Sequence, residues 1–414
     1  MSKRTAVALV SLVALIVLAG CNSYTAPSST TTTTTKSGIT TRAFVSNAGF
    51  SSGNVPASAL QIVNFKTDVL ATQQITLAGN PQMMAVTSNH VTTMVFDAGV
   101  NQLSLVDNAT EVATPAIQLP DIATSMVTLP NNTVGYVAMR NAPAAPIAGL
   151  VVAVDIVNNA LGVAFAVPRA RRMALSHNGN TLLVFSDGSN VISVINTTNN
   201  SFSIVNGGGI LDQPVNAVFS ADDSTAYILS CGPECGGTAA SVTPLNVGAM
   251  TLGTPLLVPG GATVGFVNNS TLYVAGSCAT CGGPPFGRLT VISTPALAIT
   301  TSVGISDGYH DRIEMTGNNK LYIGATNAAF SNGSASTCTN ATQGCLSMFN
   351  MSGNTAVISG PLGPVTGIAP ISGRNVVYVC EGGELVIYDD TADVPQATQI
   401  DIVGQAWDVK QIDP

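Results

Sequence analysis

The sequence has few charged residues and, beyond its first twenty positions, no helical pattern. Only 9% of its 414 residues are charged, so a folded surface must be covered mostly by Thr, Ser, Asn and Gln. The apolar runs are rich in β-branched residues, and none of them sustains the 3.6-residue period of an amphipathic helix. The 40 Gly and 22 Pro weaken a helical interpretation further. These deficits exclude an α-helical fold and predict an all-β one.

Basic residues are also scarce. The chain has 14 Lys and Arg against 22 Asp and Glu. Two of the basic residues, Lys3 and Arg4, belong to a predicted signal peptide, and its removal would leave 12 basic residues and a formal charge of −10. Proteins that bind nucleic acid neutralise phosphates with Lys and Arg. The composition therefore argues against nucleic acid as a partner.

The first twenty residues have the form of a secretion signal. After Lys3 and Arg4, the apolar run Ala6–Leu18 is too short for a comfortable membrane span. The following Leu-Ala-Gly-Cys, which ends at Cys21, resembles a bacterial lipobox, in which the peptidase cuts before the Cys and the Cys carries the lipid. An ordinary signal peptide or a single-span anchor with a chance Cys is the alternative.

The lipobox predicts a lipid-anchored protein of the bacterial cell envelope. Asn22 follows the Cys, where an Asp would favour retention in the inner membrane of enteric bacteria. We therefore expect the outer membrane, on its periplasmic side or at the cell surface. Residues 21–41 contain the lipidated Cys and a Ser/Thr-rich tether that cannot build a core and should be disordered. Residues 42–414 remain as one domain.

A pair of apolar strands joined by a tight loop recurs along the chain. In the clearest copy, residues 376–389, Val-Val-Tyr-Val-Cys precedes Glu-Gly-Gly and then Glu-Leu-Val-Ile-Tyr-Asp. A period of roughly 40 to 50 residues with about four strands per unit is typical of β-propeller blades. The eight copies of the first strand are marked by Phe44-Val45, Met94-Val95, Tyr136-Val137, Leu183-Val184, Tyr227-Ile228, Tyr273-Val274, Tyr322-Ile323 and Tyr378-Val379.

The ends of the repeat array predict how the ring closes. The repeats begin at the second strand of a unit, Arg42 to Asn47, and end with an orphan segment, Ala406 to Ile412, that resembles a first strand. Pairing of the last segment with the first blade leaves no free sheet edge at the seam. We therefore predict a single β-propeller of eight four-stranded blades, closed by the C-terminal strand.

The pattern resembles the YVTN-repeat β-propellers over residues 42 to 412. Tyr273-Val274, Tyr322-Ile323 and Tyr378-Val379 stand where that family has its Tyr-Val pair, and Ser176-His177-Asn178-Gly179 resembles its Ser-Pro-Asp-Gly turn. Val106-Asp107 and Val154-Asp155 match its apolar-Asp strand ending. Members commonly have seven blades, so seven is the alternative to the eight repeats counted here.

Seven Cys follow Cys21, and six of them form close pairs. An exported chain meets an oxidising compartment, so local disulfides are the leading interpretation, with Cys380 left over as a buried thiol. The alternative for Cys278-x-x-Cys281 is metal binding, although no His lies near it in sequence. We predict no metal and no cofactor. The predicted bridges are Cys231–Cys235, Cys278–Cys281 and Cys338–Cys345.

Two polar clusters lie in connections between blades, where they should point toward the mouth of the central funnel. The first cluster contains Arg169, Arg171 and Arg172, and it could hold a carboxylate or a phosphate. The second contains His310, Asp311 and Arg312, in which His310 could act as a general base. The alternative for the first cluster is pairing with acidic residues of neighbouring blades, and for the second a surface polar cluster.

The sequence favours a binding function over an enzymatic one. We expect a monomeric scaffold that binds a protein, a glycan or a small anionic ligand through the face with the long loops. The alternative is a hydrolase in the funnel, because phosphogluconolactonase-like enzymes share a similar repeat, yet no lactonase motif matches. Gly49–Gly53 has the Gly-x-Ser-x-Gly pattern but not the strand–turn–helix context of a nucleophile elbow. A single Trp argues against the eight-bladed quinoprotein dehydrogenases, whose repeats share Trp.

Overall fold

The computed structural model describes residues 36–48, 59–278, 281, 285–329, 335–402 and 404–414. The predicted signal peptide, Cys21, most of the predicted tether and the Gly49–Gly53 motif lie outside these residues. Among the residues described, no helix is long and apolar enough to cross a membrane.

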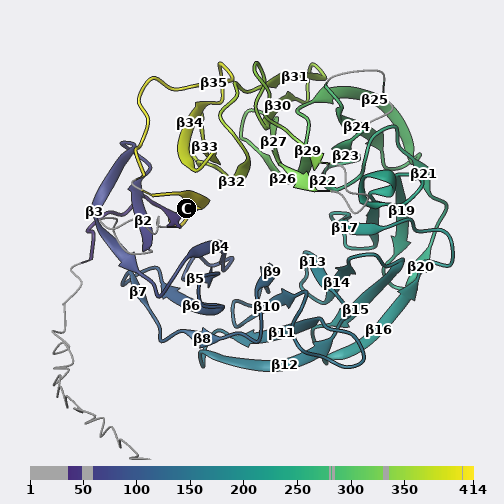
Figure 1. Ribbon diagram of the computed structural model, residues 1–414, viewed down its shortest axis with the longest axis horizontal. Helices are drawn as coiled ribbons and strands as arrows, with labels where there is room; N and C mark the ends of the chain where they lie inside the picture. The colour runs from purple at the N-terminus through teal and green to yellow at the C-terminus, as the bar shows by residue number, and fades with distance from the viewer. Residues whose placement is uncertain (1–35, 49–58, 279–280, 282–284, 330–334, 403) are drawn as a thin grey trace, which may run out of the picture. The chain divides into compact units, whose positions relative to one another are not determined.

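Residues 36–414 form a ring of eight antiparallel blades (Figure 1). Each blade has four strands in succession, named a to d from the centre of the ring outwards. In two blades strand d is interrupted and pairs with strand c as two short strands. The arrangement confirms the predicted all-β propeller with eight blades and excludes the alternative of seven.

Blades 1 to 4 contain the first half of the chain and its last strand. Blade 1 is formed by β36 (Ala406–Gln411), β1 (Arg42–Asn47), β2 (Ala59–Asn64) and β3 (Val69–Thr76). Blade 2 is formed by β4 (Pro81–Val86), β5 (Thr92–Asp97), β6 (Gln102–Asp107), β7 (Val112–Ala113) and β8 (Ile117–Gln118). Blade 3 is formed by β9 (Ala123–Thr128), β10 (Val134–Met139), β11 (Leu150–Asp155) and β12 (Ala160–Ala166). Blade 4 is formed by β13 (Ala170–Leu175), β14 (Thr181–Ser186), β15 (Val191–Asn196) and β16 (Ser201–Asn206).

Blades 5 to 8 follow in chain order. Blade 5 is formed by β17 (Pro214–Phe219), β18 (Thr225–Ser230), the 3-10 helix η1 (Gly232–Cys235), β19 (Ser241–Asn246), β20 (Thr251–Leu252) and β21 (Leu256–Leu257). Blade 6 is formed by β22 (Val264–Asn268), β23 (Thr271–Ser277), β24 (Gly287–Ser293) and β25 (Ala298–Ile305). Blade 7 is formed by β26 (Tyr309–Met315), β27 (Lys320–Thr326), the hairpin β28 (Ala328–Ala329) and β29 (Ala335–Ser336), β30 (Leu346–Asn350) and β31 (Thr355–Ile358). Blade 8 is formed by β32 (Val365–Pro370), β33 (Val376–Glu381), β34 (Glu384–Asp389) and β35 (Val394–Pro395).

The hydrophobic core lies between the blades, on strands b and c. Each blade packs between two neighbours, so these strands are covered on both faces and read as continuous apolar runs. Residues 182–185 of β14 and 192–195 of β15 are all buried, whereas five of the six residues of the outer strand β16 are exposed. Tyr136, Tyr322 and Tyr378 are among the largest fully buried side chains. The recurring Tyr side chain therefore packs between neighbouring blades.

The ring closes as the sequence predicts. β36 pairs antiparallel with β1, with Val409 opposite Val45. Beyond this pairing, Arg42 donates to Asp413 from Nε (2.8 Å) and Nη2 (2.7 Å), and its Nη1 lies 2.9 Å from Glu111 Oε1 in blade 2. One guanidinium thus joins the end of the chain, the first blade and the second blade at the seam.

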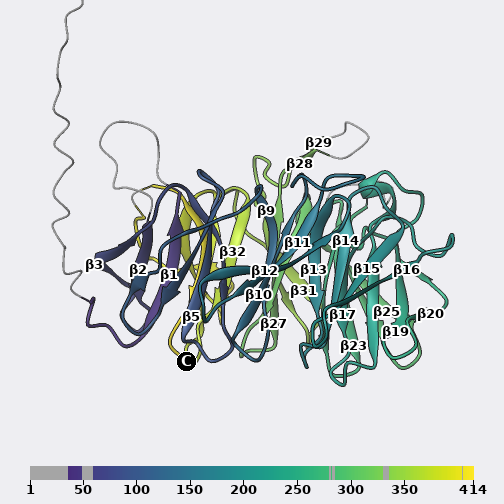
Figure 2. The same ribbon diagram turned by 90° about the horizontal axis from the view of Figure 1, so that it is seen from below.

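The loops divide between the two faces of the ring. The b–c loops and d–a connections lie on one side, which we call the loop face, and the a–b and c–d turns lie on the other, the turn face. In Figure 2 the β28–β29 hairpin marks the loop face at the top, and the C-terminus lies at the turn face below. Ser37, just before β1, donates from its N–H to Glu111 Oε2 (2.6 Å), in the c–d turn of blade 2. The described chain therefore enters the ring at the turn face.

Candidate functional site

Most of the inner strands carry a bulge near their first residues, at the end that adjoins the loop face. In β13 the register with β14 shifts between Ala170 and Arg172, so Arg171 is an extra residue. In β26 it shifts between His310 and Arg312. Blades 1, 2, 3, 5 and 8 have equivalent shifts. A bulge re-aims a side chain that strict alternation would turn the other way, and it lets consecutive residues line the same cavity.

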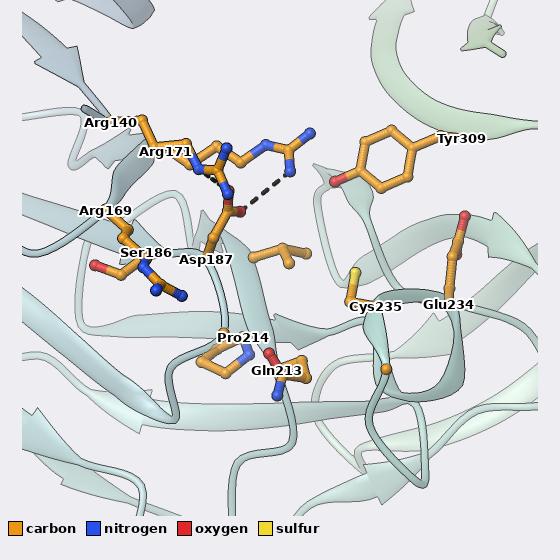
Figure 3. Close-up of a pocket in the computed structure, with 13 residues that line it drawn as sticks. Arg140, Arg169, Arg171, Ser186, Asp187, Gln213, Pro214, Glu234, Cys235 and Tyr309 are labelled. Atoms are coloured by element: carbon orange, nitrogen blue, oxygen red, sulfur yellow. Dashed lines mark hydrogen bonds and ion pairs between the residues drawn. The ribbon is translucent and has the colours of Figure 1, made fainter. Parts of the chain in front are cut away.

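A cavity of about 510 Å³ opens at the loop face, and we call it the mouth cavity (Figure 3). Its residues come from loops, strand ends and η1 of blades 3, 4 and 5 and from the start of β26 in blade 7, so it lies at the mouth of the central channel. The lining residues are Arg140, Arg169, Arg171, Ser186, Asp187, Gly188, Gln213, Pro214, Val215, Glu234, Cys235, Gly236 and Tyr309.

Three Arg side chains surround one carboxylate in the mouth cavity. Arg140 Nε lies 2.5 Å from Asp187 Oδ2, and Arg171 Nη1 lies 3.1 Å from Asp187 Oδ1. The Arg171 guanidinium also lies 5.8 Å from the centre of the Tyr309 ring, within the range of a cation–π contact. Arg169 makes no ion pair within the described part of the chain. Its backbone is fixed instead, because its N–H donates to Ala148 O (2.8 Å) and its carbonyl accepts from Asp187 N (3.2 Å).

Glu234 adds a second carboxyl group at the edge of the mouth cavity, but a neutral one. It lies in η1 and is only 8% exposed. Its Oε2 accepts from Ser277 N (3.0 Å), whereas Oε1 has no hydrogen-bond partner among the described residues. Burial raises the pKa of Glu234 to about 8, so the group is mostly protonated at neutral pH. The mouth cavity therefore holds three guanidinium charges against one ionised carboxylate.

A second cavity of about 460 Å³ lies within the channel, and we call it the channel cavity. Arg171 lines both cavities, so they adjoin at this residue. Arg172 Nη2 and Arg312 Nη1 each lie 3.3 Å from the same oxygen, Asp311 Oδ2. Arg171, Asp408 and Lys410 also line this cavity, and the rest of its wall is uncharged and rich in thioethers. The lining residues are Met83, Met84, Thr124, Ser125, Met126, Arg171, Arg172, Met173, Asn216, Asp311, Arg312, Asp408 and Lys410.

The two cavities gather the scarce basic residues of the chain. Twelve Lys and Arg follow Arg4 in the sequence, and six of them line these cavities. The six are Arg140, Arg169, Arg171, Arg172, Arg312 and Lys410. The chain as a whole has a formal charge of −8, so this concentration of basic residues is opposite in sign to the net charge.

The structure brings five of the six predicted site residues to the cavities. Arg169 and Arg171 line the mouth cavity, and Arg171, Arg172, Asp311 and Arg312 line the channel cavity. His310 is the exception. It is fully buried and lines neither cavity, and burial lowers its pKa to about 4. The prediction that His310 points into the funnel is therefore wrong. Asp311 is the extra residue of the β26 bulge. The residues of β26 that line the channel cavity begin with Asp311, one residue after His310.

Sequence reasoning missed the other charged residues and the aromatic residue of the mouth cavity. Arg140 follows β10, Asp187 follows β14, Glu234 lies in η1 and Tyr309 begins β26, and all four line the cavity. A partial signal was available, because Arg140, Asp187 and Glu234 all lie at or just after the end of a b strand. Such positions adjoin the same face in every blade. Their convergence depends on the order of blades around the ring, which no local pattern encodes.

The disulfides are those predicted, and one of them shapes the site. Cys231 is bonded to Cys235, and this bridge closes the turn of η1 that carries Glu234. Cys278–Cys281 and Cys338–Cys345 are also bonded, which leaves no free thiolates for the metal alternative at Cys278-x-x-Cys281. Cys380 is a buried free thiol, as predicted. No group of three or more His, Cys, Asp or Glu that could hold a metal occurs among the described residues.

Comparison with known proteins shows the fold and no more. No family model matches the chain, so the YVTN resemblance stays a prediction, and no curated protein matches it either. Among solved structures, "Dihydro-heme d1 dehydrogenase NirN in complex with DHE" has a TM-score of 0.65 at 9% identity, covering 90% of this chain and 75% of that one. A functionally unknown protein from Desulfotomaculum acetoxidans has a TM-score of 0.50 at 12% identity, covering 89% and 98%. At these identities the likeness establishes a β-propeller alone.

Proposed function

We propose that the protein is an exported binding protein that holds a small anionic ligand at the mouth of its central channel. The observation that carries this proposal is the convergence of three Arg from blades 3 and 4 around a cavity of about 510 Å³ with one ionised carboxylate. A cavity of this volume suits a small molecule. The excess of guanidinium charge is found in a chain that is otherwise acidic, so it is a local feature and not a consequence of composition.

The arrangement of the Arg side chains suits anion recognition. Arg140 and Arg171 are each bound to Asp187 by a single close contact, and their side chains are 45% and 50% exposed. Each guanidinium has five N–H donors in a planar fork, so most of these donors remain available to a carboxylate or a phosphate. Asp187 fixes two guanidiniums in place without neutralising all three. The cavity is thus preorganised for an anion before one arrives.

Export and anchoring rest on the sequence, and the structure adds one observation in support of export. Three local disulfides suit an oxidising compartment outside the cytosol.

The structure does not support His310 as the general base of the hydrolase alternative. A lactonase-like reaction in the funnel needs a general base within reach of the substrate. His310 was the candidate, and it is fully buried and lines neither cavity. The binding proposal does not depend on it.

The test is anion binding measured by isothermal titration calorimetry on the mature chain, with citrate, succinate and inorganic phosphate as probes. Arg169→Gln/Arg171→Gln removes two guanidiniums from the mouth cavity, and we expect it to weaken binding at least tenfold, since charge-assisted hydrogen bonds contribute about 1.5–3 kcal/mol each. The matched control is Lys36→Gln/Lys66→Gln, which removes two charges from exposed positions. Binding that weakens equally in both variants, or no binding of any probe, would contradict the proposal.

A further inference from the structure

The mouth cavity and the channel cavity have the features of two parts of one site. They adjoin at Arg171, the extra residue of the β13 bulge, which lines both. Tyr309 connects them too, because the guanidiniums of Arg171 and Arg172 each lie 5.8 Å from its ring centre. A ligand bound at the mouth could therefore extend inwards past Arg171 without leaving positively charged surroundings.

The channel cavity is a second centre of unneutralised positive charge. Four cations line it, against the carboxylates of Asp311 and Asp408. Arg172 and Arg312 share one acceptor atom, Asp311 Oδ2, at 3.3 Å each, which is long compared with about 2.7–2.9 Å for a charge-assisted bond. Lys410 lies 3.2 Å from Asp408 Oδ1. Four cations against two carboxylates leave an excess of positive charge, so this cavity retains capacity for another anion.

Part of the wall of the channel cavity is uncharged. Met83, Met84 and Met126 line the channel cavity from blades 2 and 3. Thioether side chains are flexible and polarisable, and they adapt to an apolar surface of irregular shape. An uncharged hydrocarbon spacer between two anionic groups matches this wall better than a compact, fully hydrated ion does.

We infer that the ligand is an elongated organic dianion with an apolar spacer, bound with one anionic group in each cavity. The outer group lies against Arg140 and Arg169, the inner group against Arg172, Arg312 and Lys410, and Arg171 lies between them. This inference rests on the proposed function of the mouth cavity and adds the class of ligand. Occupation of both cavities makes the second contact intramolecular, so the dianion binds more tightly than either half alone.

The experiment compares straight-chain α,ω-dicarboxylates of increasing length with monocarboxylates of the same length, by calorimetry on the mature chain. We expect one chain length at which the diacid binds at least tenfold more tightly than its monoacid. Arg169→Gln removes an outer contact and Lys410→Gln an inner one, so each should reduce diacid affinity severalfold and shrink the advantage of the diacid. Lys66→Gln is the control for loss of an exposed charge, and the melting curve of each variant reports whether it is folded.

The outcomes separate the inference from the proposed function. If diacids and monoacids bind equally, and only Arg169→Gln weakens them, the mouth cavity binds anions but the two-part site is wrong. If no carboxylate binds the wild-type chain, the proposed function itself fails. If Lys410→Gln weakens the diacid and leaves the monoacid unchanged, the inner contact is established, because a monoacid held at the mouth does not reach Lys410.

Discussion

Arg42 at the seam and Arg171 at the mouth are both paired with carboxylates, yet their surroundings differ in one decisive respect. The Arg42 side chain is 7% exposed and binds Asp413, Glu111 and the carbonyl of Asn108. The Arg171 side chain is 50% exposed and binds Asp187 through one close contact. The donors of the Arg42 guanidinium are satisfied within the protein, whereas most donors of the Arg171 guanidinium are not. Pairing alone therefore does not distinguish a structural Arg from a binding one, whereas burial and the use of donors do.

The most severe way to break the seam is to remove its last strand. Deleting residues 405–414 takes away β36 and Asp413, so β1 loses its inner partner and Arg42 loses the three hydrogen bonds that it donates to Asp413. The exposed strand edge and the uncovered apolar surface should lead to aggregation or to a fall of more than about 10 °C in Tm. Differential scanning calorimetry and size-exclusion chromatography measure both effects. A truncated chain that melts like the full-length protein would show that the ring does not depend on this closure.

A single substitution sharpens the same comparison. Arg42→Gln leaves Glu111 and Asp413 without their buried partner, and breaking a buried pair in this way costs about 3–5 kcal/mol. Arg169→Gln, at the exposed mouth, should change the free energy of unfolding by less than about 0.5 kcal/mol. Urea unfolding of the two variants gives both numbers. Equal destabilisation by the two changes would mean that the mouth Arg is as structural as the seam Arg.

The sequence predicted the ring but not the direction of its channel-facing side chains. The number of blades could be counted because strands b and c are buried on both faces, which leaves an apolar run such as Tyr-Val in every unit. Closure followed from one strand missing at the start and one in excess at the end. Three disulfides followed from close spacing in an exported chain, and the structure has all three.

The bulges and the order of blades explain what was not predicted. Alternation with a period of two would turn Arg171 and Arg172 to opposite faces, and only the bulge at Arg171 lets both line the channel cavity. The bulge at Asp311 has the same effect for Asp311 and Arg312, and His310 remains in the interior. A bulge leaves no reliable mark in a single sequence.

Substitution of Glu234 has a smaller expected effect on stability than substitution of Arg42, and the effect has the opposite sign. Its folded-state pKa of about 8 lies above the ordinary value of 4.5, because burial disfavours the charged form. The folded chain thus binds the proton more tightly than the unfolded chain does. This contribution to stability is fully present below about pH 4.5, and it is lost as the pH rises through 8. Glu234→Gln keeps the shape and removes the titration, so the variant should be more stable than wild type at pH 8, by on the order of 1–3 kcal/mol.

The same substitution reports on the mouth cavity. At pH 7 wild type and Glu234→Gln should bind an anion about equally, because Glu234 is mostly neutral there. At pH 9 the ionised carboxylate of Glu234 adds a negative charge to the cavity of wild type alone. The anion affinity of wild type should therefore fall severalfold, while that of Glu234→Gln should stay the same. The control is Asp401→Asn, which removes an exposed carboxylate and should not reproduce either effect. Unfolding curves and anion titrations between pH 5 and pH 9 test both expectations. Identical pH profiles in wild type and Glu234→Gln would show that this carboxyl neither titrates near pH 8 nor faces the bound anion.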